Sequence, residues 1–318
     1  MNVLITGAFG NVGTSLLREL LPRKTHNVRC FDLKTPVSEK RARNYTGQVE
    51  IVWGDVRNAA DVQRAAADQD VIIHLIAIIP PKSDVNPEVT KAINVGGTIN
   101  ILNAIKGKPT RLIYSSSLAL FGATQHMPPP RTVDDPIQLT DIYTETKAEC
   151  ERLIKESGVN YTILRFGAVL PIDALGTIDP LMFEVPLTDR MEFVHTYDVG
   201  LALANAIVST DIIGKTLLIG GGKRCQLYQR EVMTKPFEAL GIGALPESAF
   251  GSTTYHLDWL DTTDSQAYLK YQRFTFDDYV RDVVAAIGWK RHAIRVLRPF
   301  IRRYLLAGSP YYKRTRQS

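Results

Sequence analysis

The first half of the chain alternates short apolar runs with segments of helical periodicity. Apolar runs bounded by polar or turn residues predict strands at 2–6, 28–32, 50–53, 71–77, 111–115 and 161–165. Apolar positions at helical spacing predict helices at 12–21, 58–67, 87–105 and 143–157. Strands that alternate with helices form right-handed βαβ units, so the pattern predicts an α/β fold with a doubly wound parallel sheet.

Beyond Gly167 the pattern is less regular. Residues 171–190 are rich in Pro, Gly and Asp, while later runs predict strands at 191–194 and 216–219 and helices at 199–209 and 228–240. We expect residues 1–170 to form the sheet domain, which also receives later segments around 191–220. Residues 171–289 should mainly form a small substrate-binding cap over the carboxyl edge of the sheet.

Composition fits a globular intracellular protein. The chain has 318 residues, of which 45% are hydrophobic, and this is enough for a sizeable core. Cys30, Cys150 and Cys225 have neither disulfide-framework nor metal-site spacing, which favours the reducing cytoplasm. The chain starts with a strand-like run rather than a signal peptide, and no apolar run reaches the roughly 18 residues of a transmembrane helix.

The formal net charge is +5, and the excess of basic residues comes from the C-terminal end of the chain. Residues 290–318 carry nine basic residues and no acidic one, so the remainder has 29 basic against 33 acidic residues. An apolar stripe at helical spacing runs through this tail and is interrupted at Pro299; it comprises Ile294, Leu297, Ile301 and Leu305. We favour packing of this stripe on the body, with the arginines in solvent. Peripheral membrane contact through residues 290–318 is the alternative, and nucleic-acid binding is not expected.

A glycine-rich turn follows the first strand. Gly7 permits a sharp turn, Gly10 lets the backbone approach a pyrophosphate, and Gly13 lets the following helix pack closely on the strand. The helix N-terminus then offers free N–H groups and a partial positive charge to an anion. The motif has the sequence context of a dinucleotide-binding turn, since a buried strand precedes it and a helix follows.

An acidic residue ends the second strand. Asp32 lies 19 residues after Gly13, where a carboxylate accepts hydrogen bonds from ribose hydroxyls and repels a 2′-phosphate. This predicts a Rossmann-type domain that binds NAD rather than NADP. Asp55, after the third strand, is placed to lie beside the adenine.

A second constellation carries candidate redox chemistry. Tyr143 and Lys147 are four residues apart, so they share one face of a helix. A neighbouring ammonium lowers the pKa of a phenol and lets it exchange a proton with an alcohol or a carbonyl. Ser115, Ser116 and Ser117 follow a predicted strand, where a hydroxyl can hydrogen-bond the reacting oxygen.

With these motifs in this order, the chain resembles the extended short-chain dehydrogenase/reductase family, also called the NAD-dependent epimerase/dehydratase family. The matching pieces cover residues 1–200 in family order, and a later segment, 261–278, resembles the family's C-terminal part. The pieces are Thr6-Gly7-x-x-Gly10-x-x-Gly13, Asp32, Gly54-Asp55-Val56, His74-Leu75-Ile76-Ala77, Asn94-Val95-x-Gly97-Thr98, Ser115-Ser116-Ser117, Tyr143-x-x-x-Lys147, Leu164-Arg165 and Val194-His195-x-x-Asp198-Val199.

The resemblance implies roles for particular residues. Tyr143 would be the acid/base, Lys147 would hold the nicotinamide ribose and tune Tyr143, and Ser117 would orient the substrate, with Ser116 as the second choice. Asn94 would either support the active-site helix or be a buried structural residue. The implied NAD-binding set is Gly7, Phe9, Gly10, Asn11, Val12, Gly13, Asp32, Asp55, Val56, Leu75, Ala77, Tyr143 and Lys147.

Departures from the sugar-nucleotide enzymes of this family favour a simpler reaction. No Asn follows Leu164-Arg165, Ala267 stands where an arginine is expected, and Met191 lies where another would meet a diphosphate, with Arg190 adjacent. A diphosphate normally recruits Arg or Lys. We therefore predict hydride transfer between NAD and a secondary alcohol or ketone. The alternatives are a nucleotide-sugar epimerase or dehydratase with tightly bound NAD, and a non-catalytic dinucleotide-binding regulator.

The sequence predicts a homodimer and no metal site. His195 and Asp198 are three residues apart, but no further ligand completes a metal site, so we expect none. Family members often dimerise through two long helices, and the segments 87–105 and 143–157 could serve in this way. We therefore expect a homodimer that acts on a small-molecule substrate.

Overall fold

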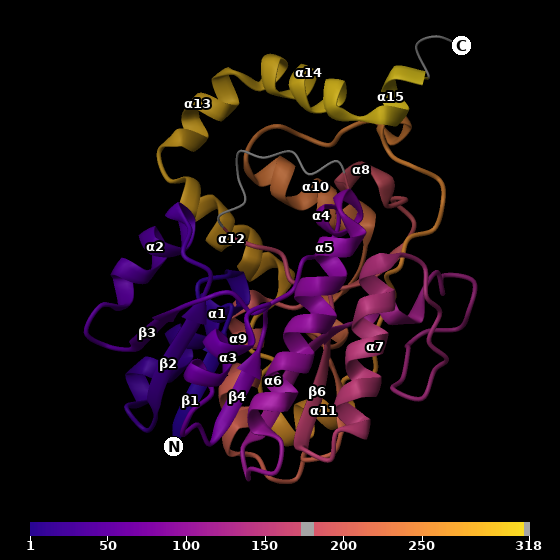
Figure 1. Ribbon diagram of the computed structural model, residues 1–318. Helices are drawn as coiled ribbons and strands as arrows, with labels where there is room; N and C mark the ends of the chain where they lie inside the picture. Colours follow the sequence, from indigo (N-terminus) through magenta and orange to yellow (C-terminus); the bar gives the residue numbers. More distant parts are fainter. Residues whose placement is uncertain (173–180, 315–318) are drawn as a thin grey trace.

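The computed structural model describes residues 1–172 and 181–314, and its centre is a seven-stranded parallel sheet (Figure 1). The strand order is β3-β2-β1-β4-β5-β6-β8, and every neighbouring pair is parallel. This confirms the predicted Rossmann-type doubly wound sheet. The strands are β1 (Asn2–Thr6), β2 (Asn27–Asp32), β3 (Glu50–Trp53), β4 (Val71–His74), β5 (Arg111–Ser117), β6 (Asn160–Phe166) and β8 (Thr216–Ile219).

Helices cover both faces of the sheet, because successive strand residues point to opposite sides. Val3 and Ile5 join a core cluster with helices α1 and α9, whereas Leu4 joins a second cluster with α3, α6 and α7. Both faces are therefore buried, which explains the nearly continuous apolar runs of the central strands. The bounds are α1 (Asn11–Leu20), α2 (Pro36–Ala42), α3 (Ala59–Ala65), α4 (Lys82–Val85), α5 (Pro87–Lys91), α6 (Gly97–Ile105), α7 (Ile142–Glu156) and α9 (Thr196–Val208).

Some elements differ from those that the apolar periodicity predicts. The predicted helix 87–105 is interrupted between α5 and α6 by a π-helical turn, Ala92–Gly96, and the short helix α2 was not predicted. The predicted strand 191–194 becomes β7 (Arg190–Glu192), which pairs antiparallel with β9 (Gln226–Tyr228) instead of joining the main sheet. Short 3₁₀ turns occupy Leu21–Arg23, Arg43–Tyr45, Leu118–Phe121, Lys223–Cys225 and Glu247–Ala249.

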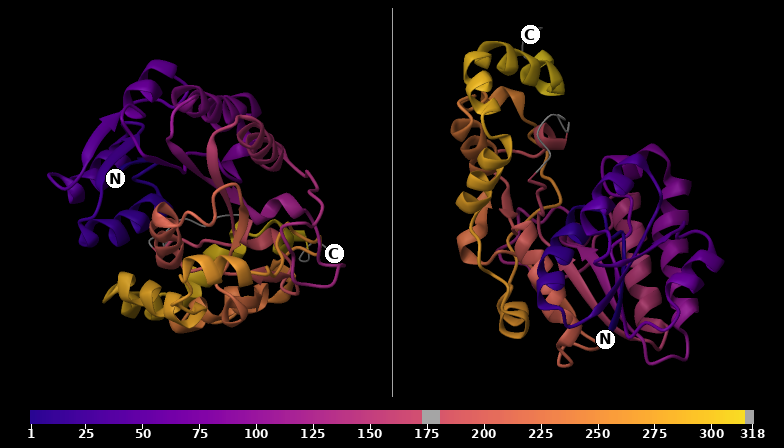
Figure 2. Two further views of the ribbon diagram at one scale, coloured as in Figure 1. Left: turned by 90° about the horizontal axis from the view of Figure 1, so that it is seen from below. Right: turned by 90° about the vertical axis from the view of Figure 1, so that its left-hand side faces the viewer.

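The later part of the chain contributes to both units. Helix α9 and strand β8 complete the sheet layer, and most of the remaining elements build a separate apolar core that includes Phe183, Phe193 and Phe276. Figure 2 shows this cap standing beside the carboxyl end of the sheet. Its helices are α8 (Leu181–Glu184), α10 (Gln229–Ala239) and α12 (Phe276–Ile287), while α11 (Thr263–Leu269) lies by the sheet and contacts α9 and β8.

The basic tail forms three helices over the outer end of the cap (Figures 1 and 2). They are α13 (Lys290–Val296), α14 (Arg298–Gly308) and α15 (Pro310–Arg314). Ile294, Ile301 and Leu305 pack on the cap core, as the favoured interpretation predicts, but Leu297 does not join them and is 48% exposed. Over residues 1–172 and 181–314, no helix has both the length and the apolar character needed to cross a bilayer.

Candidate active site

A cavity of about 500 Å³ opens where β1, β4, β5 and β6 end. The carboxyl edge of a doubly wound sheet is the usual place for a ligand, because the chain direction reverses there and leaves a crevice. Twelve of the residues that the sequence points to line this cavity. They are Gly7, Gly10, Asn11, Val12, Gly13, Leu75, Ala77, Ser115, Ser116, Ser117, Tyr143 and Lys147.

The glycine-rich turn leaves the N-terminus of α1 open toward the cavity. Gly7 has φ +70° and its N–H donates to the Phe31 carbonyl at 2.8 Å, which links the turn to β2. A Cβ on Gly13 would lie 2.4 Å from the Ala8 oxygen, so only glycine permits this close packing. Gly10, the N-cap of α1, supplies no capping side chain, and the first turn of the helix contains no acidic residue. These amides therefore fit the pyrophosphate of a dinucleotide.

Asp32 lies just outside the cavity lining, at the end of β2. Its carboxylate accepts hydrogen bonds from the backbone N–H of Phe9 at 2.9 Å and of Leu33 at 2.8 Å. Burial raises the pKa of Asp32, although these two hydrogen bonds and Arg41 act in the opposite direction. The phenyl ring of Phe9 is buried between Tyr45 and Trp53 and is therefore not available to a cofactor, while its N–H binds Asp32 and its carbonyl accepts from Arg41.

Asp55 and Val56 also lie outside the cavity lining. The Asp55 carboxylate pairs with Arg57, whose Nε lies 3.1 and 3.0 Å from its two oxygens. The Val56 side chain is buried against Gly97. Contacts of these two residues with adenine stay predictions.

Helix α7 and strand β5 bring Ser117, Tyr143 and Lys147 together. Lys147 Nζ donates to the Ser115 carbonyl at 2.6 Å and lies 5.9 Å from the centre of the Tyr143 ring. Burial lowers the pKa of Lys147 to about 8. Burial also raises the pKa of Tyr143 to about 12, while a hydrogen bond with the Ser117 side chain acts to lower it. The lysine is thus a cation at neutral pH and the tyrosine a neutral phenol.

The structure separates the two candidate serines. Ser116 donates to Glu151 at 2.6 Å, and Arg165 binds the same buried carboxylate through two contacts of 2.9 and 2.8 Å. Its hydroxyl is therefore committed to this ion pair. Ser117, one residue further along β5, has its hydroxyl beside Tyr143.

Asn94 connects the cavity wall to α7. Its amide group donates to the Ile78 carbonyl at 3.1 Å and to Thr146 Oγ1 at 3.0 Å, and its oxygen accepts from the Ile78 N–H at 2.8 Å. Thr146 lies between Tyr143 and Lys147 in the sequence. Asn94 therefore fixes the active-site helix relative to the segment after β4.

The profile of the family described as "NAD dependent epimerase/dehydratase family" matches residues 3–170, which is more than half of the 318-residue chain. The chain belongs to this family. Its named cofactor is NAD, and the open N-terminus of α1 and the glycine turn fit that dinucleotide.

Individual proteins show the breadth of the family. A "3 beta-hydroxysteroid dehydrogenase/Delta 5-->4-isomerase" of Mycobacterium tuberculosis is 34% identical over 190 residues, which cover 57% of this chain and 49% of that protein. A UDP-glucose 4-epimerase of Lactobacillus helveticus is 28% identical over 186 residues, which cover 56% of this chain and 54% of that protein. The chain thus spans about half the length of the curated relatives it matches.

Solved structures support the fold over nearly the whole chain. A short-chain dehydrogenase/reductase superfamily protein from Agrobacterium tumefaciens, crystallised with NAD, superposes with a TM-score of 0.75. The superposition covers 95% of this chain and all of that one, at 18% identity. The likeness therefore extends through the cap, beyond the part that the family profile matches.

The cap of this epimerase/dehydratase family member adds residues that the motifs did not indicate. Tyr255, His256 and Leu257 line the cavity opposite the sheet, together with Leu181 of α8. His256 Nδ1 lies 3.1 Å from Thr140 Oγ1, and burial lowers the pKa of this histidine. Tyr255, His256 and Leu257 come from an irregular segment without a recognisable pattern, so the sequence carried no signal for them.

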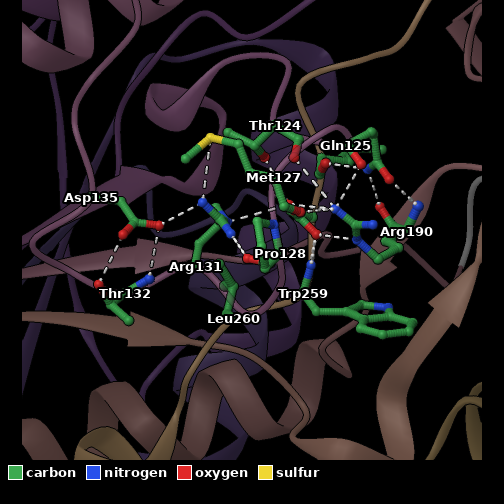
Figure 3. A network of polar contacts seen from close by, with 12 residues as sticks. Thr124, Gln125, Met127, Pro128, Arg131, Thr132, Asp135, Arg190, Trp259 and Leu260 are labelled. Carbon is green, nitrogen blue, oxygen red and sulfur yellow. Dashed lines mark hydrogen bonds and ion pairs between the residues drawn. The ribbon is translucent and has the colours of Figure 1, made fainter.

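A polar network outside the cavity holds the cap against the sheet domain (Figure 3). The buried Asp258 binds Arg190 Nε at 2.7 Å and lies 3.3 Å from Arg131 Nε. Arg190 also donates to the carbonyls of the 124–127 loop, including that of Met127 at 2.9 Å. Arg190, the arginine nearest to the position where a diphosphate would be expected, thus has a structural role.

His195 and Asp198 have structural contacts in this family member. His195 caps α9 and accepts the Tyr197 N–H at 3.2 Å. Asp198 accepts the backbone N–H groups of Arg273 and Phe274, each at 2.9 Å. Among the residues that the structure describes, no three His, Cys, Asp or Glu side chains gather as metal ligands would.

Proposed function

We propose that the protein is an NAD-dependent oxidoreductase that transfers hydride between the nicotinamide and a secondary alcohol or ketone. The observation that carries the proposal is the meeting of Ser117, Tyr143 and Lys147 in one cavity beside the uncapped N-terminus of α1. The amides at the N-terminus of α1 would hold the pyrophosphate of NAD, and these three side chains line the same cavity.

The cavity lining favours a substrate of low charge. Its substrate side is formed by Leu118, Val169, Leu181 and Leu257. Lys147 is the only Lys or Arg among the described lining residues, and Arg190 is held by Asp258. A diphosphate would be expected to recruit arginines, so this lining supports an apolar alcohol more than a nucleotide sugar.

The protein's own groups supply the proton chemistry. In the oxidative direction, Tyr143 Oη takes the hydroxyl proton of the alcohol while Ser117 hydrogen-bonds the reacting oxygen. Bound NAD⁺ supplies the hydride acceptor and a positive charge that favours the phenolate. Lys147, a buried cation below its pKa of about 8, stabilises the phenolate from the other side. In the reverse direction the Tyr143 phenol returns the proton to the forming alkoxide.

The test is the formation of NADH with a panel of secondary alcohols and the consumption of NADH with the corresponding ketones. Tyr143→Phe should lower kcat by about 10²–10⁴-fold, because it removes the proton-transfer group, and should leave NAD binding within a few-fold of wild type. Tyr161→Phe, on β6 and outside the cavity lining, is the matched control and should keep full turnover. Near-normal turnover of Tyr143→Phe would overturn the assignment.

The NADH assay also distinguishes the proposed oxidoreductase from an epimerase or dehydratase and from a non-catalytic regulator. An epimerase or dehydratase would convert a nucleotide sugar with no net change in NADH absorbance. A non-catalytic regulator would bind NAD and show no turnover with any of these substrates. Preference for NADP over NAD in a binding titration would contradict the role proposed for Asp32.

Assembly and location stay predictions. We expect a homodimer formed by α5, α6 and α7 and a cytoplasmic enzyme. Sedimentation equilibrium of the full chain would measure the first of these directly.

A further inference from the structure

Helices α13 and α14 leave a row of large apolar side chains in solvent. Trp289, Val296, Phe300 and Tyr304 expose 77%, 80%, 72% and 66% of their surfaces. Trp289 and Val296 are seven residues apart along α13, and Phe300 and Tyr304 are four residues apart on α14, so the two members of each pair lie on one face of their helix. We call these four residues the tail stripe. Exposed apolar side chains that gather on two adjacent helices mark an interaction surface more strongly than scattered exposed residues do.

The opposite side of the same helices already holds the tail on the cap. Ile294, Ile301 and Leu305 pack into the cap core. Arg298 Nε donates to the Ile242 carbonyl at 3.1 Å, and Arg302 donates to the Ala244 carbonyl at 2.7 Å. The tail is therefore a fixed element, and the tail stripe is not needed to dock it.

The charge around the tail stripe has one sign. Lys290, Arg291 and Arg303 are exposed on the same two helices, and residues 290–318 contain nine basic residues and no acidic one. The rest of the chain has more acidic than basic residues. An anionic surface would thus attract the tail and repel the body, which fixes the orientation of the molecule.

We propose that α13 and α14 dock on an anionic lipid bilayer, with the tail stripe inserted at the level of the headgroups. Trp and Tyr are the residues that favour this interface, and basic residues at the edge of an apolar helix face pair with anionic headgroups. Each Lys or Arg near such a surface strengthens binding by about fivefold. The helices would lie in the plane of the interface, since none of the described helices is suited to span it.

A second copy of the chain fits this surface less well. Two tails that met across a two-fold axis would bring their basic residues together with no acidic partner in residues 290–318. A lipid surface supplies the negative charge that a second copy lacks.

The docking surface is physically connected to the cavity. Helix α8 contributes Leu181 to the cavity lining and Phe183 to the apolar cluster that contains Leu305 of α14. Figures 1 and 2 show α8 and α14 at the same end of the molecule. A docked molecule would therefore hold this side of the cavity close to the bilayer.

The proposal is tested by co-sedimentation of the full-length protein with vesicles. Binding to phosphatidylcholine vesicles that contain phosphatidylglycerol should exceed binding to pure phosphatidylcholine by about tenfold or more and should weaken as salt is added. The fluorescence of Trp289 should shift to the blue on binding, and Trp289→Phe should remove that shift.

Matched variants distinguish vesicle binding through the tail stripe from nonspecific hydrophobic binding. The triple variant Trp289→Ser, Phe300→Ser, Tyr304→Ser should lose at least about tenfold in vesicle affinity. Lys290→Glu with Arg303→Glu should lose a similar factor. The control Val37→Ser with Val208→Ser removes two other exposed apolar side chains and should bind like wild type. All variants should keep the wild-type Tm, since these side chains are exposed.

Three outcomes would overturn the proposal. They are equal binding by wild type and the triple variant, binding that does not depend on anionic lipid or salt, and a vesicle-independent dimer that the triple variant dissociates. The last result would assign the surface to a second copy of the chain.

Discussion

The chemistry of the site depends on how burial changes single residues. Lys147 is buried and its ammonium is held by one backbone carbonyl, so the folded state carries the cost of an almost dehydrated charge. Its pKa of about 8 lies below the ordinary value of 10.5. The lysine thus couples the protonation of the active site to the stability of the fold.

Replacing Lys147 with Met should change the pH dependence of stability. At pH 7 the lysine is charged in both the folded and unfolded states, so wild type carries the full cost of burying the charge. Above pH 8 the folded state loses the proton before the unfolded state does. Wild type should therefore gain about 2 kcal/mol relative to Lys147→Met between pH 7 and pH 10. Urea unfolding at several pH values measures this difference.

An exposed lysine provides the control for this experiment. Lys108→Met should differ from wild type by an amount that does not change over the same pH range. A flat difference for Lys147→Met as well would contradict the depressed pKa of Lys147.

At the residue scale, spacing alone identified the groups whose geometry is local. The i, i+4 pair Tyr143 and Lys147 needs only a helix, and the glycine turn needs only a strand followed by a helix. The family resemblance could rank Ser116 and Ser117. The different environments of their hydroxyl groups, however, depend on β5 continuing through Ser117 and on Glu151, which binds Ser116 from across the core. His256 was not predicted because long-range packing brings it to the cavity.

At the scale of elements, close approach of helices α1 and α9 positions the nucleotide turn. A Cβ on Gly200 of α9 would lie 2.4 Å from the Ser15 oxygen of α1. Ser15 Oγ also lies 2.8 Å from Thr196 Oγ1, so the two helices are joined by a hydrogen bond at the same crossing. Backbone atoms cannot move aside as a flexible side chain can.

Gly200→Ala should therefore destabilise the protein by about 1–3 kcal/mol through overpacking. Gly96→Ala is the matched control, because a Cβ there meets nothing within 4 Å and its backbone is helical. It should stabilise by about 0.5–1 kcal/mol, since alanine loses less backbone entropy on folding. Chemical unfolding of both variants measures these changes. Similar stabilities for the two variants would show that α1 and α9 can separate without cost.

Periodicity predicted most strands and helices of the sheet domain because each has an apolar face of ordinary length. It did not predict the π-helical turn Ala92–Gly96, since one extra residue in a turn hardly changes the apolar spacing. It also could not predict the partner of β7, because a three-residue strand has no distinctive pattern and its pairing with β9 is a tertiary event.

At the scale of the whole molecule, the buried carboxylate of Asp258 links the 124–135 loop to the cap. It lies between Arg131 and Arg190, whose side chains are 3% and 15% exposed. Asp258→Ala would leave both guanidinium groups without this buried partner. We expect a loss of about 3–5 kcal/mol in unfolding free energy, as for removal of one member of a buried ion pair.

The control for this change lies in the same loop. Asp134→Ala removes an exposed carboxylate and should change stability by less than about 0.5 kcal/mol. Thermal and urea unfolding of both variants measure the contrast. A small effect at Asp258 would show that the network in Figure 3 is replaced by solvent without cost.

The alternation of strands and helices predicted the overall architecture, and the charge count alone distinguished the tail from the body. The exposed apolar face of the tail could not be inferred in this way. Leu297 and Ile301 both belong to the predicted apolar stripe, but only the packing of α13 and α14 decides that Ile301 faces the cap and Leu297 does not.

The position of β8 has a consequence for the synthesis of the protein. β8 pairs with β6, yet 49 residues separate the end of β6 from the start of β8. At about 5–20 residues per second on the ribosome, the edge of β6 would wait roughly 3–10 s for its neighbour. An unpaired, apolar strand edge is a template for aggregation during that interval. We therefore expect the nascent chain to depend on chaperones until translation has passed residue 219.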